Sequence, residues 1–149
     1  MKILKIKENK KKFLDLLLLA DEEESMIDKY LEKGELFALY GDDLKSVCVL
    51  SSLEDSYEIK NIATYPKYQK QGYGKELIEF IIDYCKSENK FKEIYVGTGD
   101  CEKILSFYEN CGFEKSHKIE NFFIDNYSEP MFEESKRLID MIYLKKDLL

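Results

Sequence analysis

The sequence lacks the features that mark membrane and secreted proteins. Its longest apolar run, residues 13–20, is interrupted by Asp15 and falls short of the roughly 20 residues that a membrane-spanning helix needs. The N-terminus reads MKILKIKENKKKF, with charged residues where a signal peptide has its apolar segment. The chain also has no linker, repeat or low-complexity block. We therefore expect one cytoplasmic domain, residues 1–149, with no membrane partner.

Metal ligands are also scarce. The four cysteines, Cys48, Cys85, Cys101 and Cys111, show no CxxC spacing, and His117 is the only histidine. A zinc site needs such residues at paired spacing, so we expect no metal. Cys48 and Cys85 lie in apolar patterns and are expected to be buried thiols.

An excess of basic residues is absent as well. The chain has 23 basic and 30 acidic residues and a net charge of −7 at neutral pH. This balance disfavours nonspecific binding to nucleic acid, so we expect no nucleic-acid partner. It mildly favours a cationic partner, although a net charge can serve solubility alone and says little about individual sites.

The sequence does contain a regular succession of strand and helix patterns. Strands are predicted over residues 2–7, 36–40, 44–50, 57–64, 93–96 and 139–144, with another after residue 113. Helices are predicted over residues 9–19, from a cap at Asp21 or Ser25 to near Gly34, from Gly72 to Cys85, and over 103–110. Residues 119–136 show no clean period. The pattern predicts an α/β (α+β) fold, a mixed sheet with helices on its faces.

The segment KYQKQGYGKELIEFIIDYC, residues 67–85, places Gly72 and Gly74 at the start of the best-defined helix. The spacing fits neither a P-loop, GxxxxGK[ST], nor the dinucleotide motif GxGxxG, because Leu77 stands where the third glycine belongs. Free backbone N–H groups and the helix dipole nevertheless make such a turn a potential anion site. A tight turn with solvated lysines would use the same residues.

Two motifs resemble one family. Gln69-Lys70-Gln71-Gly72-Tyr73-Gly74 is similar to the acyl-CoA-binding motif [R/Q]xxGx[G/A] of the GNAT superfamily of N-acetyltransferases, and the segment FYENCGF, residues 107–113, resembles its FYxxxGF segment. The likeness covers roughly residues 36–118 by motif and the whole chain by element order, and the segment from His117 to Ile142 resembles one bacterial branch of the superfamily. It implies a GNAT-like mixed, mostly antiparallel sheet of six to seven strands flanked by about four helices.

The resemblance implies acetyl-CoA as co-substrate. In this family the backbone amides of the turn bind the pyrophosphate of coenzyme A. The pantetheine arm pairs with the preceding strand, which splays from its neighbour. The implied binding residues are Ile62, Ala63, Thr64, Gln69, Lys70, Gln71, Gly72, Tyr73, Gly74 and Lys75.

Glu58 and Tyr108 are the candidate catalytic residues. The family often carries a glutamate base at the strand position of Glu58, which strand alternation places on one face with Lys60 and Ile62. An ordinary strand glutamate is the alternative. Tyr108 in the second motif is the candidate general acid, because a phenol stays protonated at neutral pH and can donate to a thiolate; a core-packing tyrosine is the alternative. Cys101 has no paired histidine, so direct transfer in a ternary complex is expected.

The predicted function is transfer of an acetyl group from acetyl-CoA to a primary amine of a small molecule or peptide. Asp125, Glu129, Glu133 and Glu134 could attract a cationic amine, or they could form a solvated loop. A non-catalytic acyl-CoA sensor and a plain interaction domain are the alternatives. The chain could act as a monomer or a homodimer.

Overall fold

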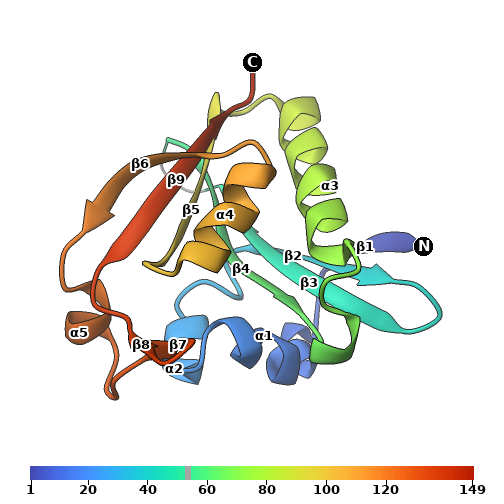
Figure 1. The fold of residues 1–149 in the computed structure, drawn as a ribbon. Coiled ribbons are helices and arrows are strands. Elements are labelled where there is room, and N and C mark those ends of the chain that lie inside the picture. Colours follow the sequence, from blue (N-terminus) through green and yellow to red (C-terminus); the bar gives the residue numbers. More distant parts are fainter. Residues whose placement is uncertain (53–54) are drawn as a thin grey trace.

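The structure, a computed structural model, describes residues 1–52 and 55–149. Its main element is a seven-stranded sheet with the order β1-β2-β3-β4-β5-β9-β6 (Figure 1). The strands are β1 (Lys2–Ile6), β2 (Glu35–Tyr40), β3 (Leu44–Ser51), β4 (Tyr57–Thr64), β5 (Glu93–Gly99), β6 (Glu114–Ile119) and β9 (Met141–Asp147). Only β4 and β5 pair in parallel within this sheet. The predicted mixed, mostly antiparallel sheet is confirmed.

Helices cover both faces of the sheet (Figure 1). One face packs against α1 (Leu14–Ala20) and α2 (Glu24–Ile27), and the other against α3 (Tyr73–Glu88) and α4 (Glu102–Asn110). Short 3₁₀ turns, η1 (Lys10–Phe13) and η2 (Pro66–Tyr68), precede α1 and α3. The segment without a clean period forms α5 (Phe122–Asn126) and a small hairpin of β7 (Phe132–Glu133) and β8 (Lys136–Arg137). No helix in the described part of the chain is long and apolar enough to span a membrane.

Two apolar layers hold the sheet between the helices. The α3 layer contains the predicted apolar face of that helix, Leu77, Ile78, Ile81, Ile82 and Cys85, all buried. The α1 layer includes Leu16, Leu17 and Ile27. Strand β3 serves both, because Cys48 and Leu50 face α3 while Val47 and Val49 face α1. A strand buried on both faces reads as a continuous apolar run.

Strand β4 contains a β-bulge at Lys60. Leu50 of β3 pairs with Ile59, but the preceding residue Val49 pairs with Asn61, so Lys60 is an extra residue on β4. A single extra residue reverses the alternation of side chains beyond it. The two halves of β4 therefore present opposite sets of side chains to each face.

The bulge corrects the prediction that Glu58, Lys60 and Ile62 share one face. Before the bulge, Tyr57 packs in the α3 layer, so its neighbour Glu58 points to the α1 side. After the bulge, Ala63 lies in the α1 layer and Ile62 packs against the α3 layer. Glu58 and Ile62 consequently lie on opposite faces, because simple alternation does not hold across an inserted residue.

The second predicted helix is much shorter than expected. Helix α2 spans only Glu24–Ile27, and its N-cap is Glu23, neither Asp21 nor Ser25. The chain then continues in turns, with the N–H of Lys29 donating to the carbonyl of Met26, and ends where the N–H of Gly34 donates to Tyr30.

A buried lysine closes this helical segment. The Lys10 ammonium is only 8% exposed and donates to the carbonyl oxygens of Leu31, Glu32 and Gly34 at 3.2, 3.2 and 2.7 Å. Free carbonyls at the end of a helical segment need donors, and a lysine can supply them. Lys10 therefore fixes the segment 24–34 against the start of α1.

The ends of β5 and β9 differ from the prediction in a similar way. β5 runs through Gly97 to Gly99, where it was predicted to end at residue 96, and β9 runs from Met141 to Asp147. Glycines are poor strand formers, which hides the end of β5 in the sequence. Pairing with β9 continues to Gly99, opposite Met141, and keeps the strand extended.

Candidate active site

The turn before α3 collects unpaired backbone donors. The N–H of Gln69 donates to Pro66 and that of Glu76 to Gly72, but the N–H groups of residues 70–75 find no backbone acceptor in the described chain. Gly72 is the N-cap of this 16-residue helix and makes no side-chain cap. We call residues 69–75 the glycine turn. Donors gathered at a helix N-terminus fit an anion such as a pyrophosphate.

The two glycines of the turn serve different purposes. Gly72 has a φ of +90°, a left-handed conformation that favours glycine, while a Cβ there would meet nothing within 4 Å. A Cβ on Gly74 would lie 3.3 Å from the Phe107 ring and 3.7 Å from the Thr64 hydroxyl. Gly74 thus lets the first motif pack closely on the second, a contact that joins the two predicted motifs.

The other residues of the turn are largely exposed. The side-chain amide of Gln69 donates to the Thr64 carbonyl at 3.1 Å, and that of Gln71 to the Lys67 carbonyl at 3.1 Å. Lys70 and Lys75 are exposed, and neither makes an ion pair with any described residue. The turn is therefore locally cationic and open to solvent.

Strands β4 and β5 separate beside the turn. Their parallel pairing ends at Ile59 and Val96, and no later pair joins them among the described residues. The binding residues predicted on β4, Ile62, Ala63 and Thr64, pair with β3 alone. The predicted splay of this strand from its neighbour is confirmed. Beyond this point the β5-facing edge of β4 has no strand partner among the described residues.

The second motif ends α4 and anchors it in the core. The N–H of Phe113 donates to the Tyr108 carbonyl and that of Gly112 to Glu109, with Gly112 at a φ of +96°. This is the Schellman arrangement of a helix C-terminus, which needs glycine at that position. The Tyr108 ring packs on Phe107 and Phe113, with centroids 5.2 and 6.0 Å apart. The motif therefore has a structural role: it ends α4 and anchors the helix in the core.

Tyr108 is also placed to keep its proton. Its side chain is 6% exposed on the α3 face, and its hydroxyl makes no hydrogen bond to any described residue. Burial, with smaller effects from Cys48 and Cys111, raises the pKa of the Tyr108 phenol above its ordinary value near 10. Tyr108 and Glu58 do not contact each other, because Glu58 faces the other side of the sheet.

Glu58 lies in a pocket of about 290 Å³ on the α1 face. We call this the Glu58 pocket; its lining is Met26, Lys29, Tyr30, Lys33, Ser51, Ser56, Glu58 and Lys60. One carboxylate oxygen of Glu58 accepts from the Tyr143 hydroxyl at 3.0 Å, and the other lies 3.2 Å from the Lys60 ammonium. Each oxygen keeps a free lone pair, so the carboxylate can still accept a proton or a water.

Tyr143 was not predicted from the sequence. It lies on β9 opposite Gly97, and a Cβ at Gly97 would come within 2.9 Å of the Tyr143 ring. The His117 ring stacks on Tyr143 with centroids 4.9 Å apart. Burial, with the nearby Glu58 charge, raises the pKa of Tyr143 well above its ordinary value, so it stays a donor. A glycine inside a strand was the sequence signal for this close approach.

A hydrogen-bond network ties the wall of the pocket to the late segment. Asp21 accepts from the hydroxyls of Tyr30 and Tyr127 at 2.9 and 2.8 Å. The Asn61 amide donates to the Tyr30 hydroxyl at 3.0 Å and to the Leu17 carbonyl at 3.1 Å. These bonds hold α1, the bulged strand and the segment after α5 in one arrangement.

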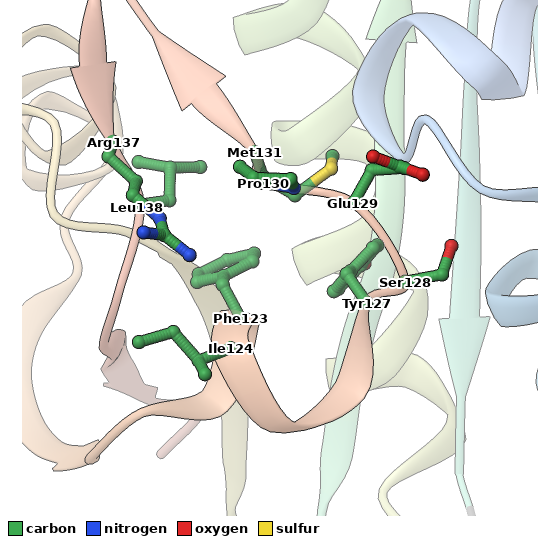
Figure 2. A pocket seen from close by; sticks show the side chains of 9 residues that line it. All are labelled: Phe123, Ile124, Tyr127, Ser128, Glu129, Pro130, Met131, Arg137 and Leu138. Carbon is green, nitrogen blue, oxygen red and sulfur yellow. The ribbon is translucent and has the colours of Figure 1, made fainter.

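A second hollow lies in the late segment, away from the predicted catalytic residues. It measures about 120 Å³ and is lined by Phe123, Ile124, Tyr127, Ser128, Glu129, Pro130, Met131, Arg137 and Leu138. Figure 2 shows Phe123, Ile124, Arg137 and Leu138 in the left half of the view and Tyr127, Ser128 and Glu129 in the right half. Neither Glu58, Tyr108 nor any residue of the glycine turn reaches it.

Comparison with known proteins identifies the family. A sequence profile of the acetyltransferase (GNAT) family matches residues 7–113. The chain belongs to this family. The uncharacterized N-acetyltransferase YvbK of Bacillus subtilis (strain 168) is 39% identical over 137 residues, which cover 90% of this chain and 88% of that protein.

Two solved GNAT structures share the fold over nearly their whole length. A GNAT family acetyltransferase from Elizabethkingia anophelis, with acetyl-CoA bound, has a TM-score of 0.91 and 36% identity over 98% of this chain and 97% of its own. A Bacillus subtilis acetyltransferase in complex with CoA has a TM-score of 0.90 and 37% identity, with 99% of each chain covered.

These findings confirm the predicted enzyme class, an N-acetyltransferase of the acetyl-CoA-dependent GNAT family, and its fold.

Cys48 and Cys85 are buried free thiols as predicted, and burial raises the pKa of both. In the described part of the GNAT chain, no three or more His, Cys, Asp or Glu side chains gather as metal ligands would.

Proposed function

We propose that this GNAT enzyme transfers an acetyl group from acetyl-CoA to a primary amine by direct transfer in a ternary complex. The observation that carries the proposal is that the pairing of β4 with β5 ends at Ile59 and Val96. Tyr108 lies on the α3 face and Glu58 on the α1 face. A donor on one face and an acceptor on the other would meet where the two strands are unpaired.

The donor is held mainly by backbone atoms. The free N–H groups of Gln71, Gly72, Tyr73 and Gly74 bind the pyrophosphate, and Gln69, Lys70 and Lys75 lie alongside it. The pantetheine arm pairs with the unpaired edge of Ile62, Ala63 and Thr64. A backbone amide near this edge that donates to the thioester oxygen would contribute about 3 kcal/mol in the transition state.

Glu58 acts as the general base. A primary amine is mostly protonated at neutral pH and must lose a proton before its nitrogen can attack the thioester carbon. The carboxylate takes that proton, directly or through a water, while Tyr143 and Lys60 hold it in place. The amine nitrogen forms the new C–N bond as the C–S bond breaks.

Tyr108 acts as the general acid. The departing sulfur leaves with the electron pair of the C–S bond and takes a proton from the phenol. A buried phenol with a raised pKa keeps its proton until that step. The phenolate then regains a proton from solvent.

Release of CoA in the presence of a panel of primary amines tests this function. We expect turnover with at least one amine, and we expect Glu58→Gln to lower kcat by about 100-fold or more. Glu120→Gln is the matched control, because Glu120 is exposed and lines neither hollow.

Calorimetry with acetyl-CoA separates the alternatives. Binding without turnover of any amine would favour a sensor of acyl-CoA over an enzyme with this acceptor. Absence of binding at high micromolar acetyl-CoA would overturn the assignment of the glycine turn.

A further inference from the structure

The charge of the Glu58 pocket points to the chemistry of the acceptor, given the proposed function. Three lysines, Lys29, Lys33 and Lys60, line it, and Glu58 is its one acidic lining residue in the described chain. The Lys60 ammonium lies 3.2 Å from Glu58 and offsets that charge. Lys29 and Lys33 make no ion pair with any described residue. The pocket is thus locally cationic in a chain of net charge −7.

The segment after α1 sorts its charges by face. Met26, Lys29, Tyr30 and Lys33 follow the spacing i, i+3, i+4, i+7 and all line the pocket. Two acidic residues of the same segment, Glu24 and Asp28, instead pair with Lys11, and the third, Glu32, is exposed and does not line the pocket. The core side holds Ile27 and Leu31. Both lysines of this segment without an ion pair therefore line the pocket, and none of its acidic residues does.

We propose that the acceptor is an amine that also carries an anionic group, a carboxylate or a phosphate, held by Lys29 and Lys33. Glu58 takes the amine end of the same molecule. The volume of about 290 Å³ admits a small molecule or the end of a longer chain. Lysine is a point charge and accepts either anion, so its chemistry fits both groups. This differs from the cationic acceptor that the net charge favoured.

Three amines of equal chain length test the proposal. The value of kcat/KM is measured by CoA release for 4-aminobutyrate, n-butylamine and 1,4-diaminobutane, which carry an anionic, a neutral and a cationic far end. Phosphoethanolamine and ethanolamine form a second pair that separates phosphate from carboxylate. We expect the anionic member to exceed its neutral partner by about tenfold in at least one series, with the diamine lowest.

Variants decide whether the lysines cause the preference. In Lys29→Gln/Lys33→Gln, we expect the ratio of anionic to neutral substrate to fall to near one. The control Lys7→Gln/Lys86→Gln removes the same charge from two exposed lysines outside the pocket and should keep the wild-type ratio.

The outcomes keep the two proposals apart. Turnover of amines with no preference for an anionic group, or a preference that survives the double variant, overturns this inference and leaves the proposed function standing. Binding of acetyl-CoA without turnover of any amine overturns the proposed function and this inference with it.

Discussion

The glycine turn and the Glu58 pocket are assembled in opposite ways. The turn is one continuous run, residues 69–75, and it offers backbone N–H groups to its ligand. The pocket is built from side chains of the segment 24–34 and of the facing ends of β3 and β4, and Tyr143 of β9 holds Glu58 from outside the lining. The first depends on local conformation, whereas the second depends on the packing of distant elements.

Because of this difference, mutations in the two regions should weaken the binding of different ligands. A change of backbone conformation in the turn should weaken acetyl-CoA and spare the acceptor. A change of a side chain in the pocket should do the reverse, because its partners lie far away in sequence; Tyr143 and Glu58 are 85 residues apart. Tyr108 belongs to neither region and lies in the core on the α3 face.

The largest effect is expected at Tyr108, which lies outside both regions. Tyr108→Phe removes the proposed acid and should lower kcat by about 100-fold, with acetyl-CoA affinity nearly unchanged. The raised pKa of the wild-type phenol also predicts that kcat does not fall as pH rises towards 10, since Tyr108 stays protonated there. Steady-state kinetics between pH 6 and about 10 measure both results.

Tyr40→Phe is the control for this change, because Tyr40 is half-buried in β2 and makes no side-chain hydrogen bond to the described residues. An unchanged kcat in Tyr108→Phe, or an alkaline fall well below pH 10 in the wild type, would remove the acid assignment.

The next largest effect concerns the stability of the segment 24–34, which forms one wall of the Glu58 pocket. Lys10→Met leaves the carbonyls of Leu31, Glu32 and Gly34 without their buried donor. We expect the free energy of unfolding to fall by about 2 kcal/mol, measured by urea denaturation. Lys12→Met, at an exposed neighbour, should change it by less than about 0.5 kcal/mol. Equal losses in both variants would show that the buried contacts do not matter.

The same contrast decides what the sequence could predict. The glycine turn and the end of α4 were predictable because Gly72 and Gly112 each occupy a left-handed position in a local motif. The apolar face of α3 was predictable from its helical period. In both cases the residues that determine the structure are neighbours in the chain.

The features that were not predicted from the sequence depend on contacts between residues far apart in the chain. The bulge at Lys60 follows from the register of β3 on β4, which carries no local signal. The short α2 is closed by Lys10, which lies 21 to 24 residues before the carbonyls it binds. Lys29 and Lys33 look like ordinary exposed lysines until the segment folds against β4. The lining of the Glu58 pocket, the proposed acceptor site, was therefore largely hidden in the sequence.

A change in the turn tests the other half of the comparison. Gly72→Val puts a β-branched residue at a φ of +90° and should distort the turn and weaken acetyl-CoA about tenfold. Gly72→Asn is the matched control, because asparagine tolerates left-handed conformations and should lose less. Isothermal titration measures both affinities. Equal losses would mean that side-chain bulk, and not backbone conformation, governs the turn.

The smallest effect is expected for the hydrogen bond that Tyr143 donates to Glu58. Tyr143→Phe removes the hydroxyl that donates to Glu58 at 3.0 Å while keeping the ring that stacks on His117. We expect kcat/KM for the amine to fall about fivefold, close to the net strength of one hydrogen bond, with acetyl-CoA affinity unchanged. Tyr95→Phe, which also contacts the His117 ring, is the control. If Tyr143 acts by holding the carboxylate, Glu58→Gln and Glu58→Gln/Tyr143→Phe should be equally slow, whereas independent losses would assign Tyr143 a separate role.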